Sequence, residues 1–413
     1  MKTQRLSILV SLLAIVAAPA TFADETSDAE AAAQQEERRK EAFRSGFASI
    51  ISDLNQQYLD SFVRAIDQED MVDRIYGLRL IDARIKKQFA ENLESSFGPM
   101  VQAGAGIARA GIVPPSGVPE DGVRYTLLGV ESRGELGRAV VRMDLNNFQF
   151  NYQQYDLRLG GGGRVIIVDW TDYLSGVTFS ESIGRYLVLA TPSKTALRKL
   201  LDFQNVSERE LYLFGEILKA ARDGNIAKFK ELRDGMHERF QRQRIVVETG
   251  VHLAKARRQR REMVAALGIM AEHFPEEPLY SLMLLDYLFP QKKYEEGIAA
   301  LVRLAEQLDF PDAAMDARLS AAYLAAGNPS EAVTYADAAI EREPGLELGW
   351  LSALNARNAV GDFSGAVVAL TGLESNFDYD LGPETLKKSK VFGNLMASEE
   401  FAAWLESRPG KDP

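Results

Sequence analysis

A run of four glycines at positions 160–163 is the first feature of this sequence that could carry chemistry. Glycine-rich loops cradle phosphate when they lead from a strand into a helix and are followed by Lys and then Ser or Thr. Here the run leads into Arg164 and then into a β-branched stretch, residues 165–168, which suits a strand. The glycines are therefore interpreted as a hairpin turn, with nucleotide binding as the alternative.

Motifs for metal binding and nucleophilic catalysis are missing from the sequence. His237, His252 and His273 lie far apart in stretches of helical pattern, so they cannot form a two-histidine metal site on one helix. The sequence contains no nucleophile elbow, no His-Glu-x-x-His pair and no complete dinucleotide or Walker loop. We therefore expect no catalytic residue, no metal and no cofactor, and we do not expect an enzyme.

A cluster of arginines stands out in an otherwise acidic chain. Arg257 and Arg261 are four residues apart, so they are expected to share one helix face, with Arg258 beside them. Such a face could dock on an anionic protein surface or on lipid headgroups. The favoured alternative is a solvated helix whose arginines balance the charge of nearby acids such as Glu262, because like charges on helices are generally exposed.

The N-terminus has the pattern of a cleavable signal peptide. Lys2 and Arg5 precede an apolar run over residues 6–18, and small residues lead to a cut after Ala23. An uncleaved anchor is the alternative, but the run is shorter than the ~20 apolar residues that span a bilayer. We therefore expect an exported protein located in the periplasm.

Length, charge and cysteine content narrow the class of protein and its partners. The chain has 413 residues, 46% of them hydrophobic, which allows two or three globular domains. Cleavage would reduce 48 cations to 46 against 59 acids, a net charge of −13, which argues against nucleic acid as the main partner. The absence of cysteine excludes disulfides, thiol nucleophiles and cysteine-ligated metals.

Hydrophobic periodicity predicts helices first and a sheet next. Residues 24–40 are acidic and rich in Ala and Gln, which predicts a solvated linker or a frayed helix start. Apolar residues at helical spacing predict two amphipathic helices between residues 42 and 97. Alternation over residues 139–145 predicts a strand, and a change of phase near residues 153–154 predicts a β-bulge. The second unit is therefore expected to be a strongly curved antiparallel sheet.

The helix-then-sheet order and the phrases YDLRL and RVIIVDWTDYLSG resemble the nuclear-transport-factor-2-like (SnoaL-like) superfamily. The resemblance covers roughly residues 41–185 and implies an α+β cone, although Arg164 and Val165 stand where an aromatic is often found. Some members are isomerases or dehydratases with a carboxylate base in an apolar pocket, which raises the pKa of the acid. If this chain has such a pocket, the candidates are Tyr125, Asp144 and Asp169, then Asp172, Tyr155 and Tyr173. The alternative is that they are ordinary strand and turn residues.

From residue 191 onward helical stretches alternate with short breaks, which predicts an α-solenoid. Gly361 follows Gly327 by 34 residues, and Ala366 follows Ala332 by the same interval. With the aromatic Trp350 in a first helix, this pattern resembles the tetratricopeptide repeat (TPR), a helical hairpin that stacks on its neighbours. A third copy is expected over residues 276–308, and a degraded fourth ends near EHFPEEP. The pattern departs from the family at Ser320, where glycine is usual, and at Asp378, where a closing proline is usual.

The TPR resemblance implies a concave groove lined by first-helix side chains. The candidates for partner binding are Ala317, Ala321, Leu324, Leu348, Leu351, Asn355 and Asn358. This surface is small and apolar, with two amides that could hydrogen-bond the backbone of a partner helix or extended peptide. The alternative is that these side chains only contact the next repeat.

The sequence therefore predicts an α+β cone, residues 41–190, followed by an all-α TPR-like solenoid, residues 191–413. The expected function is that of a periplasmic, non-catalytic adaptor or scaffold that binds a protein or peptide. The alternative is a small-ligand-binding protein or an isomerase- or dehydratase-like enzyme with a pocket in the cone. A cone interior filled by Met143, Phe150 and Leu157 would argue against that alternative. Peripheral membrane association through the arginines is a third hypothesis, and the identity of the partner and the oligomeric state stay open.

Overall fold

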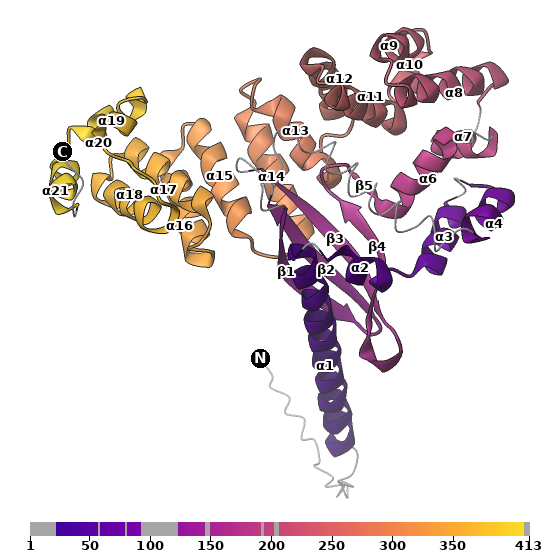
Figure 1. The fold of residues 1–413 in the computed structure, drawn as a ribbon, viewed down its shortest axis with the longest axis horizontal. Helices are drawn as coiled ribbons and strands as arrows, with labels where there is room; N and C mark the ends of the chain where they lie inside the picture. The colour runs from indigo at the N-terminus through magenta and orange to yellow at the C-terminus, as the bar shows by residue number, and fades with distance from the viewer. Residues whose placement is uncertain are drawn as a thin grey trace, which may run out of the picture.

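The computed structural model describes residues 22–56, 58–78, 81–91, 123–144, 149–190, 194–201 and 206–408. Figure 1 shows a sheet near the middle of the molecule, one long helix running along it, and a succession of helices arching over its end. The expected signal peptide, residues 1–23, lies outside the described residues except for its last two positions.

In the described part of the chain, four helices precede the sheet. They are α1 (Phe22–Asn55), α2 (Leu59–Ala65), α3 (Gln68–Gly77) and α4 (Ala83–Glu91). The stretch 24–40, expected to be a linker or a frayed helix start, is part of α1, and its described side chains are largely exposed because it has no apolar stripe. Further along α1, Phe43, Phe47 and Ile50 recur at helical spacing and are buried against the sheet.

The sheet is an antiparallel meander in the order β1-β2-β3-β4-β5. Its strands are β1 (Arg124–Arg133), β2 (Leu136–Asp144), β3 (Phe150–Leu159), β4 (Val165–Asp172) and β5 (Val177–Thr178). The exit from the glycine run is β4, and β3 pairs with β4 across it, so the hairpin-turn prediction is confirmed. Gly162 and Gly163 adopt φ of 72° and 77°, which explains why glycine is used in this turn. The contacts show an antiparallel sheet, and closure into a cone stays a prediction.

The β-bulge lies elsewhere than expected. The pairing of β2 with β3 runs without a break through residues 153–154, whereas β3 and β4 shift register so that Asp156 faces Asp169 and Leu157 faces Ile167. Val168 is therefore the extra residue. The prediction near residues 153–154 was wrong because both faces of β3 are buried, so even-numbered and odd-numbered apolar residues fill two different cores.

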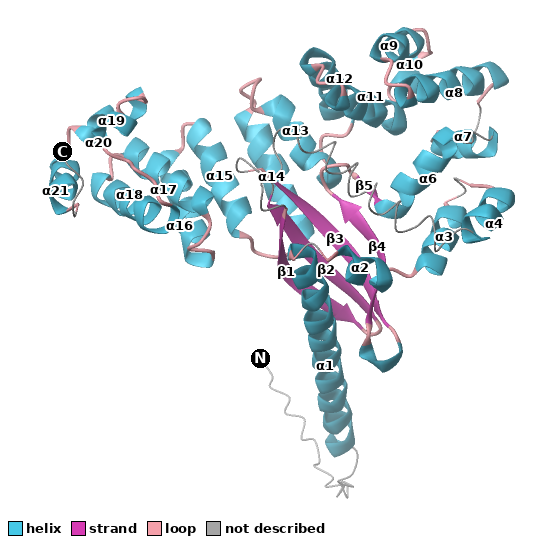
Figure 2. Ribbon diagram, in the orientation of Figure 1, coloured by secondary structure: helices cyan, strands magenta, loops and turns pink. Residues whose placement is uncertain are grey.

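Two hydrophobic cores lie against the two faces of this sheet. Tyr155 and Leu157 point to the core shared with α1, α2 and α3. Phe150 and Tyr152 point to a second core built mainly from helices that follow the sheet in sequence. Figure 2 shows the strands, in magenta, between α1 and α2 on one side and the later helices on the other. The sheet is thus the middle layer of the molecule.

The rest of the described chain is helical. It comprises α6 (Phe179–Ala190), α7 (Lys194–Leu200), α8 (Glu208–Arg222), α9 (Ile226–Asp234), α10 (Glu238–Gln241), α11 (Arg244–Ala256), α12 (Arg260–His273), α13 (Ser281–Leu288), α14 (Tyr294–Leu308), α15 (Ala313–Ala325), α16 (Pro329–Arg342), α17 (Glu347–Val360), α18 (Phe363–Phe377), α19 (Pro383–Leu386), α20 (Gly393–Met396) and α21 (Glu399–Ser407). Five pairs of these helices form helical hairpins: α8–α9, α11–α12, α13–α14, α15–α16 and α17–α18. This helical half is compatible with a TPR-like solenoid.

Five hairpin turns in the described chain share one backbone geometry. Each has a residue with positive φ between 55° and 82°: Gly224, Arg258, Lys292, Gly327 and Gly361. In every case the next residue donates its N–H to the carbonyl five residues earlier, at 2.8 or 2.9 Å. The positions differ by 34, 34, 35 and 34 residues. The repeat therefore extends over five hairpins, beyond the copies that the sequence pattern predicts.

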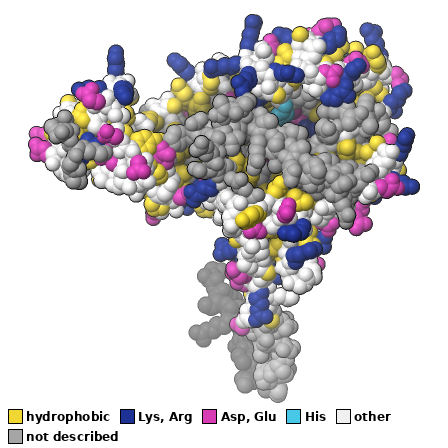
Figure 3. Space-filling model, viewed as in Figure 1, with side chains coloured by type: hydrophobic (Ala, Val, Ile, Leu, Met, Phe, Trp, Pro, Cys, Tyr) yellow, Lys and Arg dark blue, Asp and Glu magenta, His cyan; other side chains and the backbone are white. Residues whose placement is uncertain are grey.

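Two of these turns lack glycine. They lie in the expected third and fourth copies, where Lys292 and Arg258 adopt the same left-handed conformation with a full side chain. The hairpin that the sequence pattern did not include is α8–α9, whose turn carries Gly224. The side chains of Lys292 and Arg258 are exposed, and Figure 3 shows Lys and Arg side chains projecting along the edge near α9 to α12. A non-glycine residue in this conformation carries a steric penalty of about 1 kcal/mol.

Replacing Arg258 by Gly is expected to stabilise the protein. The substitution relieves the contact between Cβ and the backbone, so the free energy of unfolding should rise by about 0.5–1 kcal/mol after the entropy of the more flexible unfolded chain is included. Urea denaturation would measure it. Arg260→Gly, placed in a helix at ordinary φ, is the control and should lower stability by up to about 1 kcal/mol. Equal destabilisation by both variants would contradict the left-handed turn.

Candidate protein-binding surface

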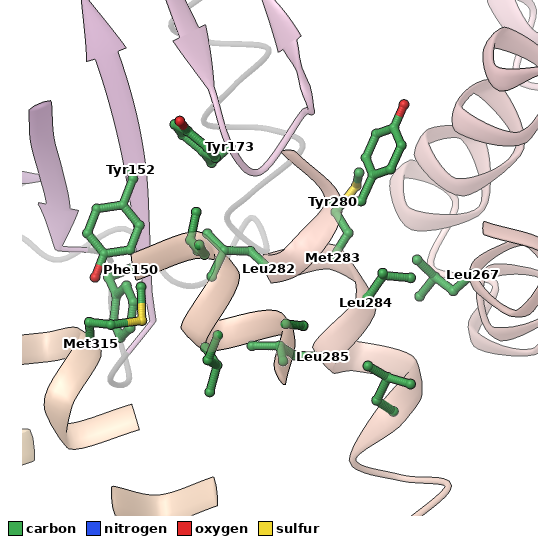
Figure 4. Close-up of a cluster of buried hydrophobic side chains, with 14 of the residues drawn as sticks. Phe150, Tyr152, Tyr173, Leu267, Tyr280, Leu282, Met283, Leu284, Leu285 and Met315 are labelled. Atoms are coloured by element: carbon green, nitrogen blue, oxygen red, sulfur yellow. The ribbon is translucent and has the colours of Figure 1, made fainter. Parts of the chain in front are cut away.

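The sheet packs against one side of helices α13 and α15. Phe150 and Tyr152 leave β3 and pack beside Met315 of α15, as Figure 4 shows. The Arg318 guanidinium lies over the Phe150 ring, 4.9 Å from its centroid. Tyr173, after β4, joins the same core as α13. The sides of α13 and α15 that face the sheet are therefore occupied by the protein itself.

A buried arginine ties β2 to the helices. The Arg142 side chain is fully buried, and its Nη1 lies 2.5 Å from Oδ1 of Asp312 and 2.9 Å from Oε2 of Glu343. Its Nε donates to Asp144 at 2.6 Å, and the Tyr152 hydroxyl donates to the other oxygen of Asp312 at 2.5 Å. Burial by itself would lower the pKa of Arg142, but Asp312, Glu343 and Asp144 raise it above its ordinary value. The arginine is therefore a permanent cation held by three carboxylates.

A second buried cluster ties α6 and α11 to Tyr280, the residue just before α13. Glu248 of α11 is 1% exposed and accepts from Arg185 of α6 at 2.7 Å and from Arg244 at 3.0 Å. The Tyr280 hydroxyl donates to the same carboxylate. Burial alone would raise the pKa of Glu248, but Arg185, Tyr280 and Arg244 hold it below its ordinary value. Arg244 also donates to the carbonyl of Gly176 near β5, at 3.2 Å, so this cluster too reaches the sheet.

The turn between α14 and α15 is clamped onto the sheet as well. Arg138 of β2 donates to the carbonyls of Gln307 and Leu308, at 2.8 and 2.6 Å, in the last turn of α14. These carbonyls form the negative end of the helix dipole, which attracts a cation. Phe310 lies so close to Gly129 that a Cβ there would meet its ring at 2.2 Å. The sheet and the solenoid share one core across the expected boundary at residue 190.

The residues expected to form a pocket in the cone have structural roles. Asp144 pairs with Arg142, and the backbone N–H and carbonyl of Tyr125 bond the side chain of Asn55. Asp169 accepts from the hydroxyl of Ser180 at 2.5 Å and from its N–H at 3.1 Å, so it anchors the start of α6. Burial raises the pKa of Asp169, and these hydrogen bonds oppose the rise. The structure does not bring the three candidates together through any of these contacts.

The other titratable candidates are similarly occupied. Asp172 accepts from Asn151 and Gln153 and from the N–H groups of the following turn. The side chains of Met143, Phe150 and Leu157 are buried, the arrangement stated above as an argument against a cone pocket. The described residues hold no cluster of three or more potential metal ligands. Burial lowers the pKa of His252, which favours its neutral form.

The expected groove residues fall into buried and accessible groups. Ala317 is fully buried, and its carbonyl accepts from the Ser352 hydroxyl at 3.2 Å. Leu348 packs against the core shared with the sheet. Asn358 donates to the carbonyl of Val391 at 3.0 Å, so the C-terminal segment closes this end. The accessible remainder consists of Ala321 and Asn355, which are exposed, and Leu324 and Leu351, which are half-buried. We call these four residues the α15–α17 surface.

A shallow pocket of about 410 Å³ opens on another side of α17. It is lined by Asp337, Ile340, Glu341, Trp350, Ala353, Arg357, Gly365, Val368 and Ala369. Arg357 pairs with Asp337 at 2.6 Å, and the Trp350 indole donates to the carbonyl of Pro344 at 2.8 Å. Apolar walls beside carboxylates suit an aliphatic side chain with a cationic end. The sequence pattern missed this pocket because it treated Trp350 only as a packing residue.

The arginine cluster does not form one helix face. α11 ends at Ala256 and α12 begins at Arg260, so Arg257 and Arg258 belong to the turn while Arg261 lies in the next helix. The expectation of a shared face was wrong, since it assumed a helix through the residue with positive φ. All three side chains are nevertheless exposed at the same hairpin tip.

Comparisons with known proteins add little to these contacts. No family model and no curated protein matches the sequence. A solved structure described as MamA MSR-1 C2 is similar to this chain at 16% sequence identity and a TM-score of 0.32, covering 42% of this chain and 98% of that one. A TM-score of this size carries no argument about function. Within the described residues, no helix combines the length and apolar character needed to cross a membrane.

Replacing Arg142 by Met is expected to lower the free energy of unfolding by about 3–5 kcal/mol, because Asp312 stays buried without its counter-charge. Chemical denaturation would measure the loss. Arg133→Met, at a side chain that is 87% exposed, is the control and should change stability by less than about 0.5 kcal/mol. A loss below about 1 kcal/mol in Arg142→Met would contradict the buried cluster.

Replacing Glu248 by Gln is expected to change the pH dependence of stability. Because the folded-state pKa of Glu248 is depressed, its contribution is present above the unfolded value of about 4.3 and is lost as pH falls through the folded value. The variant should be less stable than wild type near neutral pH, and the difference should shrink below pH about 4. Thermal unfolding across pH would measure it, with exposed Glu306→Gln as control. A difference independent of pH would contradict this assignment.

Proposed function

We propose that this protein is a non-catalytic adaptor that holds a protein or peptide partner on the α15–α17 surface. The observation that carries the proposal is that the sheet covers the central hairpins of the helical half and leaves part of the terminal hairpins accessible. α13 and α15 meet the sheet at Tyr173, Phe150 and Tyr152, whereas the α15–α17 surface extends beyond these contacts. A solenoid whose central hairpins are filled by its own sheet offers its terminal hairpins to other molecules.

The chemistry of this surface favours a peptide or helix with basic residues. Residues 313–377 contain eight acids and three basic residues, so the terminal hairpins attract cations. Leu324 and Leu351 supply partly exposed apolar area. Asn355 currently donates to the carbonyl of Leu351 in its own helix, and its amide oxygen can accept from a partner backbone.

The 34-residue spacing of the turns supports a TPR-type protein as the finer description. The pattern of residues 1–23 supports export and a periplasmic location for the adaptor. The alternative proposal is a small-ligand-binding protein or enzyme of the nuclear-transport-factor-2-like type, and it requires a cavity away from Met143, Phe150 and Leu157.

The adaptor proposal is tested by crosslinked capture from periplasmic extract with a two-site variant. Leu351→Lys combined with Asn355→Lys removes apolar contact and adds two cations that repel a basic partner, so recovery of a stoichiometric partner should fall at least about tenfold. The matched control is Ser364→Lys with Ser375→Lys, two exposed positions on α18. Quantitative mass spectrometry of the captured proteins would measure recovery, and circular dichroism would verify the fold.

Two results would contradict the adaptor proposal. One is the absence of a stoichiometric partner for the wild-type protein. The other is a partner retained equally by both double variants, which would place its contact outside the α15–α17 surface. A partner lost only from the α17 variant, and rebound by purified wild-type protein, supports the proposal.

A further inference from the structure

A row of cations follows the tips of two adjacent hairpins. We call Arg257, Arg258, Arg260, Arg261, Lys292 and Lys293 the basic edge; all six side chains are exposed. No acid occurs between residues 257 and 261, although the whole chain has a net charge of −11. The equivalent turns of the terminal hairpins carry Gly-Asn and Gly-Asp at 327–328 and 361–362. The positive charge is therefore local to one part of the solenoid edge.

The backbone at the basic edge is less favourable than it could be. Arg258 and Lys292 have φ of 55° and 58°, at the turn position that glycine occupies in the three other hairpins. Glycine would relieve a steric penalty of this conformation at either position. The structure shows no hydrogen bond or ion pair of these two side chains with other described residues that would compensate for it. Backbone strain that no contact compensates supports the hypothesis that these side chains have a function.

The acids closest in sequence leave much of this charge unneutralised. Glu262 bonds Lys230 at 3.2 Å, and Glu296 lies 3.7 Å from Lys293. Arg257 donates to the backbone carbonyl of Asp223 at 3.4 Å, a contact that leaves its charge in place. Arg258, Arg260, Arg261 and Lys292 have no acidic partner among the described residues.

The shape of the edge fits a flat partner. Adjacent packed helices lie about 8–10 Å apart, so the tips of neighbouring hairpins form a ridge. Figure 3 shows Lys and Arg side chains standing out along the rim of the molecule near α9 to α12. A guanidinium on a ridge can bind phosphate oxygens in a planar surface through two parallel hydrogen bonds. A peptide, by contrast, is usually held in a groove.

We propose that the basic edge docks the protein on an anionic phospholipid surface. The basic edge lies on the turn between α11 and α12 and on the turn between α13 and α14. The proposed adaptor surface lies on α15 and α17, so one molecule can use both. Docking requires no membrane-spanning helix, because the phosphates of the headgroups neutralise the cations at the surface. The assignment is independent of the adaptor proposal and can fail without it.

Vesicle co-sedimentation of the purified full chain tests this assignment. The protein should bind vesicles of phosphatidylcholine with phosphatidylglycerol, release at high salt, and ignore phosphatidylcholine alone. Arg258→Glu with Arg261→Glu should lower the partition coefficient at least about tenfold, since each cation near an anionic bilayer contributes roughly a fivefold factor. Lys387→Glu with Lys388→Glu, two exposed positions of equal charge change, should bind like wild type.

A second variant separates charge from folding. Arg258→Gly with Lys292→Gly should weaken vesicle binding by a similar factor while raising resistance to urea, whereas a purely structural role would lower both. Soluble poly-glutamate serves as competitor. Binding to poly-glutamate without binding to vesicles would assign the edge to an acidic protein and overturn the proposal. Equal vesicle binding by the glutamate variant and its control would overturn it as well.

Discussion

The architecture depends on burying the Arg142 guanidinium between carboxylates from three segments. A buried cation without partners would cost many kcal/mol, so β2 can hold this side chain only when Asp312 and Glu343 are in place. These acids stand 170 and 201 residues away in the chain. The stability of the sheet therefore depends on the positions of α15 and α16, and these helices are in turn held in place by Arg142. The Glu248 cluster repeats the arrangement with opposite sign next to β5, where Arg244 bonds the carbonyl of Gly176.

Buried polar clusters of this kind specify geometry more than they add stability. An apolar contact between Phe150, Tyr152 and Met315 could slide, because the hydrophobic effect has no direction. The hydrogen bonds from Arg142 and from the Tyr152 hydroxyl allow one registration of the sheet on α15. The solenoid is thereby fixed relative to the long helix α1, with the terminal hairpins held out from the sheet.

Local patterns predicted local structure well. The β-branched residues after the glycine run indicated the hairpin, and Gly327 and Gly361 marked two turns of the repeat. What failed was information carried by distant neighbours. The second buried face of β3 made its alternation look like a bulge, and the left-handed Arg258 and Lys292 gave the third and fourth copies no glycine to mark their turns. Nothing near Arg142 in sequence indicates Asp312 as its partner, so the central contact and the covered groove surface could not be predicted from periodicity.

The order in which the chain is made gives the covered sheet a further consequence. β1 to β4 are complete by residue 172, but Glu343 is added 171 residues later, roughly 10–30 s at ~5–20 residues per second. Until α15 is made, Phe150 and Tyr152 on one face of the meander lack Met315, the helical side chain beside them. Nascent chains of this protein therefore pass through an incomplete state that exposes apolar surface. Apolar side chains of the early sheet that stay uncovered until late helices are made are a site at which incomplete chains can aggregate.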